Sequence, residues 1–231
     1  DIMEVNEYYK VDGKWYGFVK DWSPDYSIFI RKDHFEEAGV PVPSATEPVS
    51  LEQWREWAPQ LMIKEGDQVK RWGTDFTPLV APLFYQPTTY EPAGSLYTED
   101  KTKMNLVDNE DNYEAAKFMF DWKAEGTIPS AVNPTIGDWA GPDFRDGVAA
   151  ATMYGFWFSG FTHEAEWDLP NNIMMLPAAT WGPNYSNPCA AGTGCMVNSQ
   201  TEHPDAAWAL FSYFMFEEPA INRAKIGWGV P

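Results

Sequence analysis

The 231-residue chain is long enough to form one large domain or two small ones around a sizeable hydrophobic core. Hydrophobic residues make up 44% and charged residues 22%, a composition typical of globular proteins and not of disordered ones. The 34 acidic and 16 basic residues leave a net charge of −18, which repels phosphate backbones and excludes nucleic acid as an expected partner. No run of about 18 apolar residues occurs, so we expect no membrane span.

The N-terminal part of the chain predicts strands and a short helix. Alternating residues over Tyr8–Phe18 favour a strand or a hairpin, with Asp12-Gly13 as its turn. A β-rich run over Tyr26–Ile30 predicts a further strand. We expect a brief helix over Lys32–Ala38, because Gly39 follows it as a stop signal.

A capping box at Ser50–Gln53 predicts the start of the next helix. Pro59 is expected to kink or shorten this helix. Arg71–Phe76 is typical of a strand, and the Pro- and aromatic-rich stretch Leu79–Tyr97 is expected to be irregular, with room for a short helix. The apolar residues that share one face of the predicted helix are Leu51, Trp54, Ala58, Leu61 and Met62.

The clearest helix signal covers Asp111–Glu125, with Gly126 as its C-terminal cap. The acidic run Asp108–Asp111 lacks the glycine and the distant glutamate of a calcium loop, so we interpret it as helix capping. The apolar face of this helix comprises Ala115, Ala116, Phe118, Met119 and Trp122.

Strands and helices continue to alternate toward the C-terminus. We expect strands at Val148–Tyr154, Ile173–Leu176 and Cys195–Asn198. Helices are predicted near Thr162–Trp167 and over Pro204–Phe216, the second with proline in its first turn. This alternation predicts an α/β fold.

The two cysteines, Cys189 and Cys195, lie in one short stretch with two glycines between them. An extended chain would hold their Cα atoms about 20 Å apart, too far for a disulfide, whereas a loop through the glycines would bring them together. A local disulfide and two buried thiols therefore remain alternatives. No His/Cys spacing suggests zinc, and we expect neither a metal nor a cofactor.

Aromatic residues are unusually abundant. The chain holds 12 Trp, 11 Tyr and 14 Phe, or 16% of its residues, and many lie beside Gly and Pro in predicted loops. Trp and Tyr combine an apolar face with a polar group, which suits sugar rings that stack through C–H faces and hydrogen-bond through hydroxyls.

Four segments in chain order carry a family resemblance. They are residues 11–17 followed by 27–39 (Val-Asp-Gly-Lys-Trp-Tyr-Gly, then Ser-Ile-Phe-Ile-Arg-Lys-Asp-His-Phe-Glu-Glu-Ala-Gly), residues 48–54, residues 144–157, and residues 192–208. Together they resemble the bacterial extracellular solute-binding protein family 1. Two positions differ from the family's usual pattern: its Tyr-Asn is Ile30-Arg31 here, and its Thr-Trp is Ser50-Leu51. These differences bear on the subfamily and not on the family.

The resemblance implies an α/β, periplasmic-binding-protein-like fold of two lobes, incomplete here. Residues 1–25 would be the end of the first lobe and the first hinge crossover, residues 26–187 the second lobe, and residues 188–231 the second crossover and the return into the first lobe. The chain is accordingly expected to be a piece of a longer protein, without its signal segment.

The resemblance also implies a function. The protein would be the substrate-binding component of an ABC importer, binding a sugar or oligosaccharide in an aromatic-lined interlobe cleft and delivering it to the membrane permease subunits. It would act as a monomer on the extracellular side of the bacterial cytoplasmic membrane, either in the periplasm or as a lipid-anchored lipoprotein.

Trp157 is the ligand contact that the family position favours most. It follows Tyr154-Gly155-Phe156 on the loop after an apolar strand, where the family places a tryptophan that stacks on a sugar ring. The alternative is a tryptophan of the core. The neighbouring Phe156 is a further candidate.

The remaining predicted ligand contacts are weaker. Phe84 and Tyr85 lie in the irregular stretch, where lining the cleft and packing in the core are equal alternatives. Trp22 and Asp25 fall at the first crossover, where the family often has an aromatic or polar contact. The glycines Gly192 and Gly194 near the second crossover would let the backbone approach a ligand or would shape a hinge turn.

The alternative function is a glycoside hydrolase, since an aromatic cleft with acids serves both purposes. Hydrolysis needs two carboxylates about 5 to 10 Å apart, one of them with a raised pKa. Asp25, Glu91, Asp143 and Asp146 are candidates, but no pattern pairs them. No nucleophile elbow, phosphate loop or metal motif is present, and we expect no catalysis.

Overall fold

A computed structural model describes residues 4–21, 24, 26–76, 97–100, 102–105, 108–136, 139–162, 172–181, 184–185 and 193–226. The chain divides into two compact units, each described by itself. Unit 1 comprises Asp1–Asp25, Gly155–Glu164 and Cys189–Pro231, and unit 2 comprises Tyr26–Tyr154 and Ala165–Pro188. Unit 1 thus includes Gly155–Glu164, a segment that falls within the range predicted for the second lobe; the assignment of units to lobes of a longer protein stays a prediction.

Unit 1 begins with a 3-10 helix, η1 (Glu4–Tyr9), and a hairpin of β1 (Lys10–Val11) and β2 (Lys14–Trp15). The predicted turn is confirmed: Asp12 and Gly13 both have positive φ, 49° and 77°, as a tight hairpin turn requires. The strand predicted from Tyr8 is wrong at its start. The Asn6 side chain accepts a hydrogen bond from the Val19 backbone at 2.7 Å, a contact that the local alternation does not encode.

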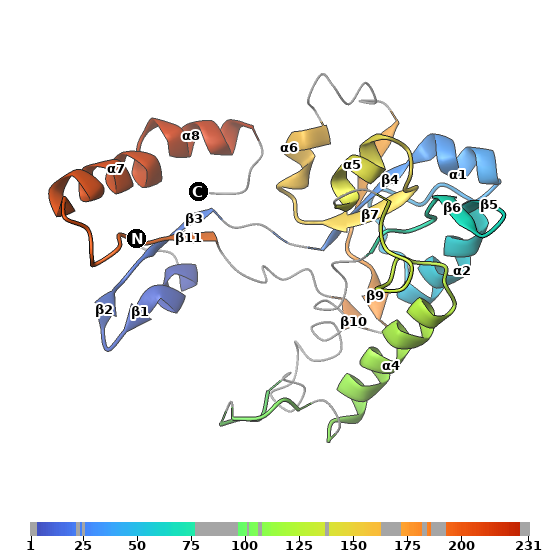
Figure 1. The fold of residues 1–231 in the computed structure, drawn as a ribbon, viewed down its shortest axis with the longest axis horizontal. Helices are drawn as coiled ribbons and strands as arrows, with labels where there is room; N and C mark the ends of the chain where they lie inside the picture. Colours follow the sequence, from blue (N-terminus) through green and yellow to red (C-terminus); the bar gives the residue numbers. More distant parts are fainter. Residues whose placement is uncertain are drawn as a thin grey trace. The chain divides into compact units, whose positions relative to one another are not determined.

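The second sheet of unit 1 joins distant parts of the chain. Strand β3 (Phe18–Asp21) pairs antiparallel with β11 (Thr193–Cys195), as Figure 1 shows. The predicted strand Cys195–Asn198 lies two residues too late, because Thr193 and Gly194 supply the pairing while Met196 is 63% exposed.

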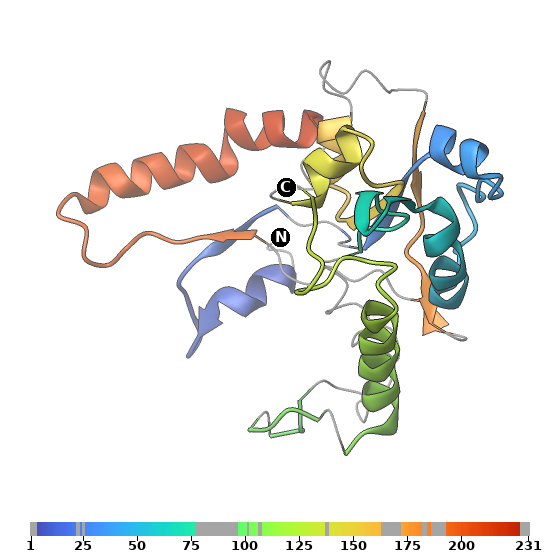
Figure 2. The same ribbon diagram turned by 45° about the vertical axis from the view of Figure 1, so that its right-hand side comes forward.

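Three helices complete the described part of unit 1: α6 (Phe158–Thr162), α7 (Pro204–Phe216) and α8 (Glu218–Lys225). Helices α7 and α8 follow one another at the end of the unit and pack together (Figure 2). The bounds of α7 match the prediction. The helix predicted near Thr162–Trp167 stays a prediction, because residues 163–171 lie outside the described residues and only Thr162, the last residue of α6, is described.

Unit 2 is built around a sheet of order β7-β4-β8. The central strand β4 (Ser27–Arg31) pairs antiparallel with β7 (Ala151–Tyr154) and with β8 (Ile173–Leu176). Single parallel bridges, Trp72 to Ala149 and Asp75 to Thr152, extend the sheet beyond β7. Residues 28–30 are fully buried on both faces, as expected of a central strand.

The strand predicted over Arg71–Phe76 is only partly correct. The regular strand is β6 (Gln68–Arg71), which forms a hairpin with β5 (Ile63–Glu65), and residues after Arg71 contribute the two parallel bridges. A second short hairpin joins β9 (Thr180–Trp181) and β10 (Asn184–Tyr185).

The helices of unit 2 follow their predicted end signals. α1 (Lys32–Ala38) ends at Gly39 with φ 67°, and α2 (Leu51–Leu61) begins at Ser50, whose side chain accepts the Gln53 backbone N–H. Pro59 neither breaks nor stops α2, which continues two residues further. α4 (Glu110–Ala124) agrees with its prediction within one residue, and α5 (Ala140–Arg145) was not predicted. In Figure 1, α1 lies beside α2 and α5 beside β7.

The core of unit 2 is an aromatic cluster between the helices and the sheet. Trp54 lies at its centre, with edge-to-face contacts to Phe35, Trp57 and Phe76, at ring-centroid distances of 6.2, 5.4 and 5.3 Å. Phe76 in turn contacts Trp122 of α4 at 6.2 Å. The predicted apolar faces of α2 and α4 therefore build this core, except for Met62 and Ala116, which are not part of the cluster.

Candidate functional site

The turn that carries Trp157 is fixed by backbone hydrogen bonds within unit 1. It follows β7 directly, and the Phe156 N–H donates to the Pro24 carbonyl at 2.9 Å. The Phe158 N–H donates to the Gly155 carbonyl at 2.9 Å, and the Gly160 N–H donates to the Trp157 carbonyl at 3.2 Å. These two bonds lead into the first turn of α6. Phe158 is fully buried and anchors the turn, so Trp157 stands on a defined backbone and not on a loose loop.

The indole of Trp157 is half-buried. Its ring meets Phe158 and Phe161 edge-to-face, with centroids 5.9 and 6.0 Å apart and interplanar angles of 87° and 80°. These contacts hold the ring while leaving part of it accessible. The neighbouring Phe156 is 36% exposed. The structure therefore brings two of the predicted contacts, Phe156 and Trp157, onto one aromatic turn.

Gly194 has a structural reason to be glycine. A Cβ atom at this position would lie 1.9 Å from the Tyr9 hydroxyl oxygen and 2.0 Å from the Tyr9 ring, so the tyrosine covers the backbone of β11. The Tyr9 side chain therefore occupies the space next to the Gly194 Cα that a ligand would need to approach the backbone there. A role of Gly194 in ligand contact stays a prediction.

The other predicted contacts, Trp22, Asp25, Phe84, Tyr85 and Gly192, lie outside the described residues. Cys189 does too, while Cys195 on β11 is a half-buried free thiol.

The carboxylates nominated for glycoside hydrolysis do not form an acid–base pair in the described part of the chain. Asp143 is buried, and its carboxylate accepts the Ile136 backbone N–H at 3.0 Å. Asp146 is exposed and binds Arg145 at 2.7 Å, a hydrogen bond that lowers the pKa of Asp146, whereas a general acid needs a raised pKa. Asp25 and Glu91 lie outside the described residues.

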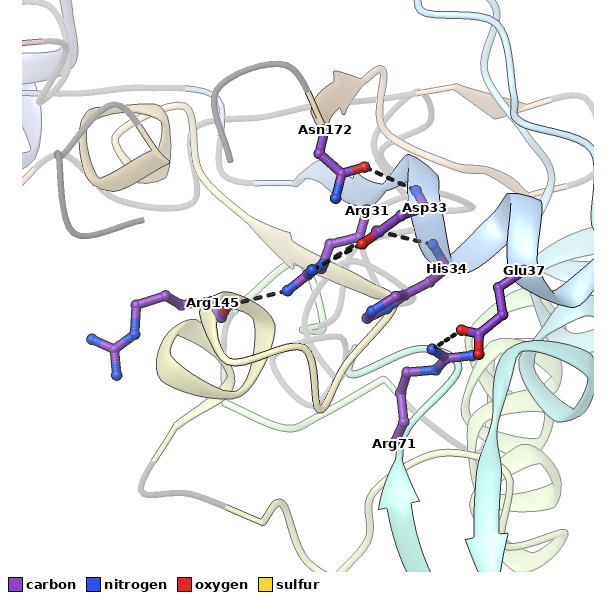
Figure 3. A network of polar contacts seen from close by, with 7 residues as sticks. All are labelled: Arg31, Asp33, His34, Glu37, Arg71, Arg145 and Asn172. Carbon is purple, nitrogen blue, oxygen red and sulfur yellow. Dashed lines mark hydrogen bonds and ion pairs between the residues drawn. The ribbon is translucent and has the colours of Figure 1, made fainter. Parts of the chain in front are cut away.

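A polar network joins β4, α1, α5 and β6 in unit 2 (Figure 3). The Arg31 guanidinium binds the Asp33 carboxylate at 3.0 Å and donates to the Arg145 carbonyl at 3.1 Å. Arg71 is buried, binds Glu37 at 2.6 Å and donates to the Leu61 carbonyl at 3.2 Å. Both guanidinium groups are engaged within the network. We therefore interpret the role of the network as structural: it holds these helices and strands together.

Asp33 is held ionised by this network. Burial by itself raises the pKa of its carboxyl, but hydrogen bonds with Arg31 and with Asn172 outweigh burial and lower the pKa to about 2. The Asp33 backbone N–H also donates to the Asn172 side chain at 2.8 Å.

His34 gives the network a dependence on pH. Its side chain is buried, and burial together with the charges of Arg71 and Arg31 lowers the pKa of His34 from 6.5 to about 4; Asp33 and Glu37 oppose this only in part. Between pH 4 and pH 6.5, His34 therefore binds a proton in the unfolded chain but not in the folded chain. Stability due to neutral His34 is therefore present above pH 6.5 and is lost as the pH falls toward 4.

We expect His34→Gln to remove this dependence. Between pH 7 and pH 5 the unmodified chain should lose about 2 kcal/mol of unfolding free energy more than the variant, measured from urea denaturation at both pH values. The matched control is His203→Gln, at an exposed position, which should leave the difference unchanged. Parallel stability profiles of the chain and His34→Gln would contradict the assignment.

No group of three or more His, Cys, Asp or Glu side chains in the described part of the chain is placed to hold a metal ion. None of the helices in the described ranges combines the length and the apolar character needed to cross a membrane.

Comparisons with known proteins identify a family that matches this chain. The family model described as bacterial extracellular solute-binding protein matches residues 4–220. The arabinooligosaccharide-binding protein of Halalkalibacterium halodurans is 24% identical over 224 residues, which cover 93% of this chain and 46% of that protein. The chain thus spans about half the length of this relative.

Solved structures show the same fold. An ABC substrate-binding protein of Listeria monocytogenes in complex with cycloalternan has a TM-score of 0.70 at 23% identity, over 99% of this chain and 55% of that one. An ABC transporter associated binding protein of B. animalis subsp. lactis in complex with β-1,6-galactobiose has a TM-score of 0.71 at 19% identity, over 97% and 53%. The predicted α/β, periplasmic-binding-protein-like fold is confirmed, with about half of each structure matched.

Proposed function

Since the chain belongs to the family of bacterial extracellular solute-binding proteins, we propose that the full-length protein reversibly captures a sugar or oligosaccharide and delivers it to the permease of an ABC importer. The observation that carries this proposal is the family match over residues 4–220. The names of the relatives support a carbohydrate: one binds arabinooligosaccharides, and others were solved with cycloalternan and β-1,6-galactobiose.

The aromatic turn supports the same ligand class. Phe156 and the half-buried Trp157 present ring surface on a backbone that hydrogen bonds hold in place. A sugar stacks its C–H face on such a ring without any covalent chemistry, and a pre-positioned ring loses little freedom on binding. In the full-length protein, closure of two lobes would trap the sugar by shifting an equilibrium between open and closed forms. We propose binding without catalysis, by a monomer outside the cytoplasmic membrane.

Calorimetry of the full-length protein against a defined panel tests the proposal. We expect saturable binding of at least one of arabinotriose, maltotriose and β-1,6-galactobiose, and none of amino acids, phosphate or divalent metals. Chromatography of the sugar after prolonged incubation should recover it intact. Binding confined to the non-sugar ligands would refute the sugar assignment, and cleavage of the sugar would favour the hydrolase.

A further inference from the structure

Helix α7 in unit 1 is apolar on most of its circumference. Asp205 is the one charged residue among its 13, and its buried residues are Phe211 and Met215. At about 100° per residue, its exposed large apolar side chains are distributed over several sides of the helix. They are Trp208, Leu210, Tyr213, Phe214 and Phe216, with exposed fractions between 39% and 68%. A helix that is apolar all round is typical of a protein interior, so this pattern indicates an interior position for α7.

An apolar groove of about 400 Å³ lies beside α7. Met196 and Val197, which follow β11, line it together with Leu210 and Phe214 of α7. Met196 is 63% and Leu210 68% exposed, so the described part of the chain leaves much of this apolar surface uncovered. Exposed apolar surface of this kind marks a place where another polypeptide segment packs.

Arg223 on α8 packs against α7 with part of its hydrogen-bonding capacity unused. Its guanidinium lies over the Phe214 ring, 4.6 Å from the ring centroid, and Nη1 donates to the Phe214 carbonyl at 2.9 Å. Nε and Nη2 are buried, and neither has a hydrogen-bond partner in the part of the chain that the structure describes. Because buried donors of folded proteins are nearly always paired, unit 1 as described lacks a segment that supplies acceptor oxygens here.

The hydrophobic core of unit 1 is too small for an independent fold. In the described ranges, unit 1 buries four hydrophobic residues, Phe158, Phe211, Met215 and Ala220, whereas the main hydrophobic cluster lies in unit 2. The β3–β11 sheet has two strands, too few for stability in water without further packing. The chain spans 46% of the arabinooligosaccharide-binding relative, so a full-length protein of that size has about as much polypeptide again with which to complete this unit.

We propose that the face formed by α7, α8 and the groove beside α7 is an internal interface, covered in the full-length protein by the part of the same polypeptide outside the present 231 residues. That part places apolar side chains on α7 and in the groove, and acceptor oxygens at Arg223. A second copy of the chain or a permease subunit would cover one side of α7, whereas exposed rings on several sides require a segment that folds around the helix. The inference concerns the fold and does not depend on the carbohydrate function.

Hydroxyl-radical footprinting of the full-length protein tests this coverage without any substitution. Tyr213 on α7 and Tyr113 on α4 are a matched pair, because they are 47% and 49% exposed in the present chain. We expect Tyr213 to be oxidised at least about fivefold more slowly than Tyr113, with each rate normalised to the unfolded protein, at concentrations where light scattering shows a monomer. Equal rates would overturn the proposal. Protection that disappears on dilution would also overturn it, since that result would assign the face to a second copy.

Photo-cross-linking identifies the covering segment. In the full-length protein, p-benzoylphenylalanine in place of Tyr213 should form a cross-link within one polypeptide, to a peptide outside the present 231 residues. The same replacement of Tyr113 is the control and should not cross-link to that peptide. A melting temperature within about 3 °C of that of the unmodified protein shows that the variant folds, and if it does not fold, the footprinting result decides alone. A cross-link to a second copy, or one confined to residues of the present chain, would contradict the inference.

Discussion

Replacing Trp54 with alanine is expected to lower the free energy of unfolding by about 3–5 kcal/mol, the largest stability effect we predict. Trp54 is fully buried at the centre of the aromatic cluster of unit 2, in contact with Phe35, Trp57 and Phe76. Alanine would leave a cavity among rings that pack edge-to-face, and neighbours fixed on α1 and α2 cannot collapse fully into it. Chemical denaturation followed by circular dichroism measures the loss.

The control for Trp54→Ala is a substitution of an exposed ring in the same unit. Phe120→Ala on α4 removes a side chain that is 72% exposed, and its effect should stay within about 0.5 kcal/mol. Equal losses for the two variants would show that the cluster around Trp54 is not the stabilising core.

Elements with strong local end signals could be predicted from the sequence. The bounds of α1, α7 and β8 agree with their predictions, because a glycine in the left-handed region follows α1, a proline opens α7, and a proline follows β8. Such signals act through the backbone of adjacent residues, and distant parts of the chain do not alter them.

Elements that depend on distant partners could not be predicted. Helix α5 contains Gly141 and Pro142, which local propensity disfavours, yet its last residue is held from far along the chain, because Arg31 of β4 donates to the Arg145 carbonyl at 3.1 Å. The residues after β6 join the sheet only through bridges to Ala149 and Thr152, far along the chain. Tertiary contacts decide both cases.

The features of the candidate site also differ in whether local sequence could predict them. The turn of Trp157 could be predicted, since glycine and aromatic residues follow an apolar strand there. The contact of Tyr9 with Gly194 could not, because it joins the end of η1 to β11, which lie far apart in the chain.

Trp157→Ala in the full-length protein should weaken sugar binding by about 2 kcal/mol or more, roughly thirtyfold in dissociation constant. Stacking on an indole buries apolar C–H surface of the sugar, and aromatic contacts of this kind carry a large share of the binding energy at such sites. Trp157→Phe keeps an aromatic face on the same turn and should lose less. Calorimetry with the sugar selected from the panel gives the affinities.

The folding stability of the same variant decides what Trp157 does. The residue is half-buried, whereas Trp54 is fully buried, so removal of the Trp157 ring should cost about 1 kcal/mol, well below the cost expected for Trp54. A core tryptophan would show the reverse pattern, a loss of about 3–5 kcal/mol in stability without a specific loss of affinity. Unchanged sugar affinity together with a collapse of the melting temperature would therefore assign Trp157 to packing and remove it from the binding site.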